Sequence, residues 1–287
     1  MSLLDPRLNA FFTIAKIGTV QGSAKELGIT QTGVTQRIRS LEQMLSVTLF
    51  IRSRSGMKLT SEGEALFRYC QGATDLEGQT LSAIKGQAHQ TNVALVVAGP
   101  TSIMTSRIVP ACGPLYDKFP FLYLSFRLDD NENRVELLKK GIVQFAVLSP
   151  EEVTNEMDSK VLKPEKYVLV CSTKWKNRKL SNILEKERII DFYETDQTTF
   201  RYLKKFGLFE SAKKTRLFSN TNETITHLFV EGVGYGTLTL ETAHPLIESG
   251  KLIVLNQQKV LEDSQALAWY PRPEMPEYFS EIVRCIK

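Results

Sequence analysis

Residues 28–42 read Gly28-Ile29-Thr30-Gln31-Thr32-Gly33-Val34-Thr35-Gln36-Arg37-Ile38-Arg39-Ser40-Leu41-Glu42. Three apolar residues at helical spacing, Val34, Ile38 and Leu41, predict a helix with one buried face. The other positions carry amides, hydroxyls and guanidiniums, which are the groups that contact base edges and phosphates in the major groove of DNA. These candidate DNA-contacting residues are Gln31, Thr32, Thr35, Gln36, Arg37 and Arg39. The alternative is an ordinary solvated helix surface.

Two further helices are predicted before this stretch. Apolar residues recur with helical period after Pro6, and Gly18 ends that segment. A second, shorter helix is predicted over residues 21–27, and Thr30 has the side chain expected of an N-cap for the third. Two helices, a tight turn and a third helix form a helix-turn-helix arrangement.

A basic turn follows these helices. Residues 52–59 read Arg52-Ser53-Arg54-Ser55-Gly56-Met57-Lys58-Leu59. A Ser-Gly turn flanked by Arg and Lys is typical of a small β-wing that lies on phosphates or reaches a minor groove. The basic residues are expected to neutralise phosphates rather than to read bases. They are Arg37, Arg39, Arg52, Arg54 and Lys58.

The charge of the chain is concentrated near its start. The 287 residues carry a formal net charge of +4 and are enough for two domains. Residues 1–60 contain eight Lys or Arg but three Asp or Glu, so the rest of the chain is nearly neutral. This distribution favours a polyanionic partner for the first part, although a chance excess of surface basic residues would look the same.

Targeting and redox signals are not apparent in the sequence. No apolar run approaches the roughly 20 residues that span a bilayer, and no signal peptide is recognisable. The four cysteines, Cys70, Cys112, Cys171 and Cys285, are scattered without metal-ligand spacing. They are expected to be buried thiols in a reducing compartment, with a redox sensor as the alternative. We therefore expect a cytoplasmic protein without a membrane or metal partner.

A long helix is predicted to begin at Ser61, with Ser61 and Glu64 as a capping box. Residues at alternating spacings of three and four then form a rough coiled-coil seam, which predicts pairing with a second copy. The seam consists of Leu66, Tyr69, Ala73, Leu76, Thr80 and Ala83. The alternative is that the helix packs on its own domain. A polar hinge is expected over residues 86–92.

The remaining chain alternates strands and helices. Buried strands are predicted over residues 93–98, 121–128 and 145–148, separated by helices, which indicates a parallel α/β sheet. Ligands of such sheets bind beyond the carboxyl ends of the strands. The candidate effector-binding residues there are Thr101, Ser102, Asp129, Asp130, Ser149, Asp196, Thr221 and Asn222. Thr101 and Ser102, at a helix start, are expected to hold a carboxylate, while the acidic residues suit a cationic group. Each residue alone could equally be an N-cap or turn residue.

The N-terminal motifs resemble those of LysR-type transcriptional regulators. The matching positions are Gly18…Ala24…Leu27-x-Ile29-x-Gln31-x-x-Val34-x-x-x-Ile38-x-x-Leu41-Glu42, then Leu49-Phe50-x-Arg52 and Leu59-Thr60-x-x-Gly63. The resemblance implies an all-α winged helix-turn-helix over residues 1–60, a linker and dimerisation helix with a hinge over 61–89, and an effector-binding domain over 90–287. It also implies that the last domain is a two-lobed, periplasmic-binding-protein-like α/β fold. Lobe I would comprise residues 90–163 and 266–287, and lobe II residues 164–265, with crossovers near 161–165 and 262–266.

The same resemblance implies partners. They are double-stranded DNA, a second copy through the linker helix, a tetramer of such dimers, and RNA polymerase. The segments Leu128-Asp129-Asp130-Asn131-Glu132 and Trp269-Tyr270-x-Arg272 are similar to those of the arginine- and lysine-responsive ArgP branch, which implies lysine or arginine as effector and no cofactor.

Two other classes of function stay open. An enzyme or binding protein with an appended helix-turn-helix is disfavoured, because none of the three histidines, His89, His227 and His244, is placed with a nucleophile or metal set. A chromosome-organising DNA-binding protein would keep the winged domain but would respond to no effector.

Overall fold

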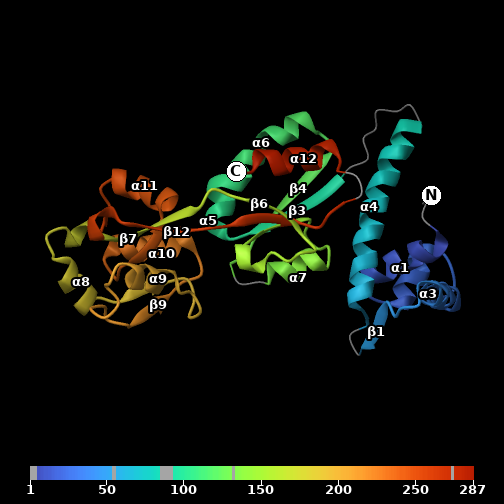
Figure 1. The fold of residues 1–287 in the computed structure, drawn as a ribbon, viewed down its shortest axis with the longest axis horizontal. Helices are drawn as coiled ribbons and strands as arrows, with labels where there is room; N and C mark the ends of the chain where they lie inside the picture. Colours follow the sequence, from blue (N-terminus) through green and yellow to red (C-terminus); the bar gives the residue numbers. More distant parts are fainter. Residues whose placement is uncertain (1–4, 54–55, 85–92, 131–132, 273–274) are drawn as a thin grey trace.

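The computed structural model describes residues 5–53, 56–84, 93–130, 133–272 and 275–287. In Figure 1 the chain is drawn out in a row, with a small helical unit at one end, a long helix beside it, and then two α/β lobes. None of the described helices is long and apolar enough to cross a membrane.

The N-terminal unit, residues 5–59, is a winged helix-turn-helix. Its elements are α1 (Pro6–Ile17), α2 (Val20–Leu27), α3 (Gln31–Leu45), β1 (Phe50–Ser53) and β2 (Gly56–Leu59). Thr30 caps α3 as predicted, because its hydroxyl oxygen accepts a hydrogen bond from the Gly33 N–H at 3.0 Å. The apolar face of α3 is buried against α1 and α2, and β1 pairs antiparallel with β2 to form the wing.

The long helix α4 (Ser61–Ile84) begins differently from the prediction. The cap is Thr60 and not Ser61: the Thr60 hydroxyl accepts from the Gly63 N–H at 3.0 Å and donates to the Thr48 carbonyl at 2.7 Å. Glu64 is buried and lies 3.7 Å from the Lys139 ammonium of the next domain. The predicted capping box is therefore wrong, because Glu64 pairs with a residue distant in sequence.

Lobe I is a five-stranded sheet of order β4-β3-β5-β13-β6 between helices. Helices α6 and α12 pack on one face and α7 packs on the other. Its strands are β3 (Val93–Gly99), β4 (Leu122–Leu128), β5 (Phe145–Leu148), β6 (Asp158–Val161) and β13 (Ala266–Trp269). Its helices are α5 (Thr101–Ile103), η1 (Met104–Ile108), α6 (Val109–Lys118), α7 (Arg134–Lys139), η2 (Pro150–Glu152) and α12 (Glu277–Cys285).

Lobe II is built around the central strand β7 (Glu165–Ser172). Strands β10, β11 and β12 all pair antiparallel with segments of β7, while β8 and β9 form a parallel pair. The other strands are β8 (Ile189–Asp191), β9 (Arg216–Phe218), β10 (Gly236–Thr239), β11 (Leu252–Val254) and β12 (Val260–Asp263). The helices are η3 (Thr173–Trp175), α8 (Leu180–Lys186), α9 (Thr198–Lys205), α10 (Asn222–Glu231), α11 (Leu240–Glu248) and η4 (Asn256–Gln258).

The expected parallel sheet is only part of this architecture. In lobe I, β3 is parallel to β4 and β5, but β13 runs antiparallel to β5 and β6. The antiparallel strands are those that connect the lobes, because the chain leaves lobe I between β6 and β7 and returns between β12 and β13. The two connections, residues 162–164 and 264–265, are short and adjacent, since the Leu162 N–H donates to the Gln265 carbonyl at 2.9 Å, and this is the arrangement of a hinge.

Candidate functional site

The polar face of α3 points away from the core of the N-terminal unit. With Val34, Ile38 and Leu41 buried, the 3.6-residue period places Thr32, Gln36 and Arg39 on the opposite side. Thr35 lies beside them, and its hydroxyl donates to the Gln31 carbonyl at 2.9 Å, leaving its lone pairs available to a ligand. Gln31 lies at one edge of this face, whereas Arg37 lies at the other flank of the helix.

The wing is fixed relative to α3. The Glu42 carboxylate near the end of α3 accepts from the Leu49 N–H at 2.8 Å, and the Met57 N–H donates to the Gly18 carbonyl at 2.9 Å. Lys58 is exposed on β2. Arg52 is on β1, but its side chain, like all of Arg54, lies outside the described residues. The hinge predicted over residues 86–92 lies outside them as well.

A cavity of about 300 Å³ lies between the two lobes, and we call it the interlobe cavity. It is lined by Pro100, Ser102, Asp130, Tyr167, Phe192, Tyr193, Thr195, Asp196, Thr198, Asn222, Thr237, Leu238 and Thr239. Four predicted effector residues are in this lining: Ser102, Asp130, Asp196 and Asn222.

The four other candidates lie outside that lining. Thr101 and Asp129 adjoin Asp130, Thr221 caps α10, and Ser149 caps η2 together with Glu152. These are the N-cap and turn roles that the sequence also allowed.

The start of the first lobe I helix is already capped by a side chain. Asp130 accepts from the Thr101 N–H at 2.8 Å and from the Thr101 hydroxyl at 2.7 Å. The donors that the sequence assigned to an effector carboxylate are thus engaged by an internal carboxylate. Asp130 still faces the cavity and keeps acceptor capacity, because a carboxylate has about four lone-pair sites.

A half-buried arginine organises the lobe II wall. Arg216 forms an ion pair with the buried Asp191 at 2.6 Å and donates to the carbonyls of Tyr193, Glu194 and Asp196. This holds the loop after β8 in place, where Tyr193 and Asp196 line the cavity and the Asp196 carboxylate accepts from the Phe192 N–H at 3.3 Å and the Thr198 N–H at 2.8 Å. The pKa of Tyr193 is raised, first by burial and then by the negative charges of Asp130 and Asp129 in lobe I. Asp130 of lobe I and Asp196 of lobe II thus line the same cavity.

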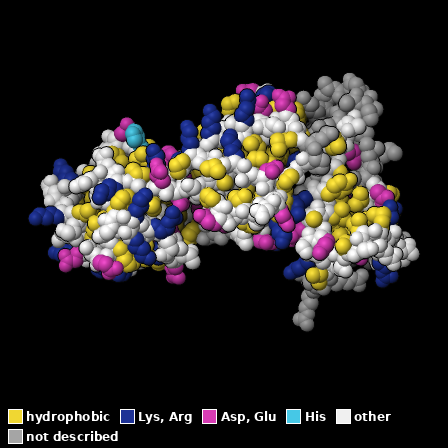
Figure 2. All heavy atoms as spheres, viewed as in Figure 1, with side chains coloured by type: hydrophobic (Ala, Val, Ile, Leu, Met, Phe, Trp, Pro, Cys, Tyr) yellow, Lys and Arg dark blue, Asp and Glu magenta, His cyan; other side chains and the backbone are white. Residues whose placement is uncertain are grey.

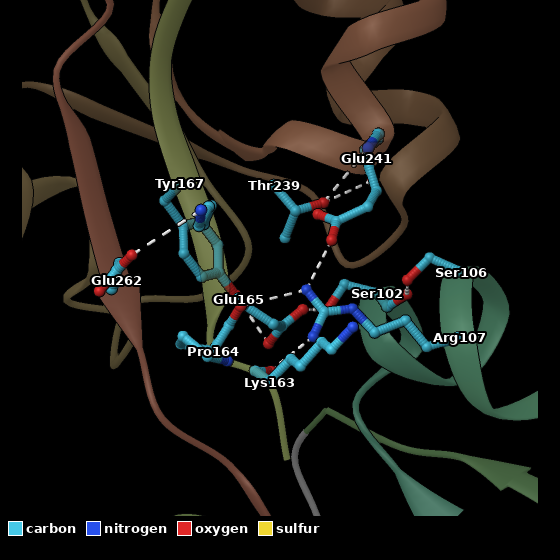
Figure 3. A network of polar contacts seen from close by, with 12 residues as sticks. Ser102, Ser106, Arg107, Lys163, Pro164, Glu165, Tyr167, Thr239, Glu241 and Glu262 are labelled. Atoms are coloured by element: carbon cyan, nitrogen blue, oxygen red, sulfur yellow. Dashed lines mark hydrogen bonds and ion pairs between the residues drawn. The ribbon is translucent and has the colours of Figure 1, made fainter. Parts of the chain in front are cut away.

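A polar network lies behind the cavity, at the first connection between the lobes (Figure 3). Arg107 of η1 donates to the Lys163 carbonyl at 2.5 Å and to the Pro164 carbonyl at 3.2 Å, and pairs with Glu241 of α11 at 2.5 Å. Glu165, the first residue of β7, accepts from the Ser102 hydroxyl at 2.8 Å.

Several lining residues were not predicted from the sequence. Tyr167, Thr237 and Thr239 come from β7 and β10, strands that meet only through long-range antiparallel pairing. Glu165 gave no signal, because a single acidic residue at a strand start is usually exposed. Arg216 also gave none, since its role depends on the fold of a loop more than twenty residues away.

Comparisons with known proteins identify the class of this protein. A family profile described as bacterial regulatory helix-turn-helix protein, lysR family, matches residues 6–64, and one described as LysR substrate binding domain matches residues 88–287. The chain therefore belongs to the LysR family, as the sequence motifs predicted.

Two transcriptional regulators are similar to part of this chain in sequence. The chain is 27% identical over 172 residues to the transcriptional regulator DsdC of Escherichia coli, which is 60% of this chain and 54% of that protein. It is 25% identical over 177 residues to the transcriptional regulator LysG of Mycobacterium tuberculosis, covering 62% and 57%. The chain thus spans about half the length of the curated relatives it matches.

Two solved structures share the fold over nearly the whole chain. ArgP from Mycobacterium tuberculosis aligns with a TM-score of 0.82 and 21% identity, and LysG from Corynebacterium glutamicum with bound effector Arg aligns with 0.80 and 18%. Each alignment covers 99% of this chain and 96% of the other. At these identities the likeness establishes the fold alone.

Proposed function

We propose that this protein is a DNA-binding transcriptional regulator whose DNA binding is modulated by a small molecule in the interlobe cavity. One observation carries the proposal: a single chain combines an exposed polar face on α3, flanked by a wing, with a cavity between two hinged lobes. A ligand that binds the closed arrangement of the lobes better than the open one shifts their equilibrium. As a DNA-binding protein it would work in the cytoplasm; contact with RNA polymerase stays a prediction.

The effector class we propose is a basic amino acid, lysine or arginine. Asp130 from lobe I and Asp196 from lobe II both face the cavity, and like charges brought together resist closure. A cation between them removes that repulsion and adds attraction to both lobes. LysG from Corynebacterium glutamicum, which shares this fold, has been solved with arginine bound.

We also propose that the protein dimerises through α4. Tyr69, Leu76 and Thr80 are exposed on this helix, and with Ala73 they follow spacings of four, three and four, which puts them on one face. Leu66 differs from the predicted seam, because it packs into the core of its own N-terminal unit. Tyr69, Ala73 and Leu76 of this face also line a groove of about 810 Å³ between α4 and lobe I.

A DNA-binding experiment tests whether α3 contacts bases. A specific site is first selected from a random pool with the full protein. Replacing Gln31 and Thr35 together with Ala should abolish preference for that site while lowering affinity for random DNA much less, because base contacts specify and phosphate contacts position. Lys58→Ala should instead weaken both and reduce the salt slope by about one unit. Equal losses on both DNAs in the double variant would refute base reading by α3.

A thermal-shift screen separates this proposal from a chromosome-organising protein. Lysine or arginine should raise the melting temperature, since a ligand of the folded state stabilises it by mass action. A chromosome organiser would show specific or general DNA binding without such a shift. No shift with any basic amino acid would refute the effector class while leaving DNA binding intact.

A further inference from the structure

Glu165 is a buried carboxylate that lacks an ion-pair partner among the described residues. It is 2% exposed, and Arg107, the cation whose charge acts on it, directs its nitrogens to Glu241 and to two backbone carbonyls. A buried charge is costly unless it is paired with an opposite charge. No ion pair among the described residues therefore balances the negative charge of Glu165. This carboxylate lies directly behind the wall of the interlobe cavity.

Two hydroxyls connect Glu165 to the cavity. Ser102 donates to its Oε1 at 2.8 Å and the Tyr167 phenol donates to its Oε2 at 3.4 Å, and both residues line the cavity (Figure 3). A hydroxyl has one hydrogen and two lone pairs. Because both hydrogens are directed at Glu165, the oxygens of Ser102 and Tyr167 can present only lone pairs to a ligand.

The neighbouring part of the cavity wall, in lobe I, has the same polarity. Asp130 offers carboxylate lone pairs, and the N–H and hydroxyl of Thr101, which could have donated to a ligand, are bonded to Asp130. This side of the cavity consequently accepts hydrogen bonds and offers few. It suits an ammonium or guanidinium group and disfavours a carboxylate.

We propose that Glu165 is a positioning residue that orients the effector, with the cationic end on Ser102, Tyr167 and Asp130. The carboxylate end of the amino acid then lies toward α9 and α10 of lobe II, where Thr198 and Asn222 supply hydroxyl and amide donors. This orientation is opposite to the one predicted from the sequence, which placed the carboxylate on Thr101 and Ser102. It rests on the proposed function, because it concerns the same cavity and the same class of effector.

Proton linkage follows from this position. Burial raises the pKa of Glu165, the Ser102 hydrogen bond and the Arg107 charge lower it, and the charges of Asp263 and Glu241 raise it; Tyr167 is the other titratable group in contact. A bound cation favours the ionised carboxylate. Arginine affinity should therefore increase as pH rises through the raised pKa, and binding below that pKa should release a proton.

Calorimetry on the full chain tests the inference with arginine and its neutral analogue citrulline, and with lysine and norleucine. In the wild type the cationic ligands should bind at least tenfold more tightly than the neutral ones. Glu165→Gln keeps the size but turns one donor toward a cavity hydroxyl, so arginine affinity should fall about 10- to 100-fold and citrulline affinity should not. The proton release on arginine binding, measured in buffers of different ionisation enthalpy, should disappear.

Matched variants keep the result interpretable. Glu262→Gln, on the neighbouring strand and paired with the exposed Lys166, should leave affinity and proton release unchanged. Tyr167→Phe removes one acceptor and should lower arginine affinity several-fold with Glu165 intact. If Glu165→Gln and Tyr167→Phe both keep the wild-type ratio of arginine to citrulline, the orientation is wrong and the proposed function stands. If the wild type binds no basic amino acid, the proposed effector class and this orientation both fail, while the proposed DNA-binding function stands.

Discussion

At the scale of single residues, Gly63 shows how one missing side chain allows two elements to pack. It lies in the first turn of α4, and a Cβ built there would overlap the carbonyl oxygen of Leu49 and lie 3.0 Å from the Leu59 side chain. The helix can therefore approach the wing closely only with glycine at this position. The same carbonyl accepts the Thr60 N–H at 3.0 Å, so it cannot move away freely.

We predict that Gly63→Ala destabilises the N-terminal unit by about 1–3 kcal/mol, because the backbone must shift to relieve the overlap. Gly72→Ala on the same helix is the control, since nothing lies within 4 Å of the Cβ it would add. That change should be neutral or stabilising by at most about 1 kcal/mol. Chemical unfolding followed by circular dichroism measures both. Equal stability of the Gly63→Ala variant and the wild type would show that the backbone of the wing can shift without cost to make room for the added methyl group.

At the scale of elements, a local sequence pattern made α3 predictable, whereas the cavity wall depends on long-range strand pairing and could not be predicted from the sequence. The spacing of Val34, Ile38 and Leu41 and the cap at Thr30 are local, so they identify the helix without any tertiary contact. The position of Tyr167 depends on β7 being flanked by antiparallel strands that follow it by tens of residues. No spacing in the sequence encodes that arrangement. The predicted capping box of α4 was wrong for the same reason, because Glu64 pairs with a lysine that is distant in the sequence.

The exposed face of α4 leads to a prediction about assembly. Leu76→Glu places a charge on that face in both copies of a dimer, and should raise the dimer dissociation constant at least tenfold, since burying a leucine contributes about 1.5–3 kcal/mol. Thr74→Glu, which is exposed on the opposite side of the same helix, should leave the dimer intact. Sedimentation velocity across a concentration series measures both. A Leu76→Glu variant that stays dimeric would place the subunit contact elsewhere.

At the scale of the whole molecule, α4 is bonded to the effector lobes through lobe I. The Arg68 guanidinium lies 4.0 Å from the centre of the Tyr270 ring and donates to the Lys139 carbonyl at 2.6 Å. Gln71 donates to the Gly141 carbonyl at 3.0 Å. Tyr270 directly follows β13, the strand on which the chain returns from lobe II. We therefore expect a change in the angle between the lobes to reach α4 through this strand and the arginine stacked on Tyr270.

We predict that Arg68→Ala uncouples the two sites without damaging either. Allosteric coupling typically amounts to 1–3 kcal/mol, a 5- to 150-fold change in affinity, and it is reciprocal between ligands. In the wild type, arginine should change DNA affinity by some factor, and DNA should change arginine affinity by the same factor. In Arg68→Ala both factors should fall toward one, while arginine binding without DNA and DNA binding without arginine stay within about threefold of wild type. Thr74→Glu should keep the coupling, because Thr74 takes no part in the stacking of Arg68 on Tyr270. Fluorescence anisotropy and calorimetry measure the two directions independently.

Full coupling in Arg68→Ala would show that the signal bypasses Tyr270. Loss of coupling in one direction alone would violate linkage and indicate partial unfolding of the variant.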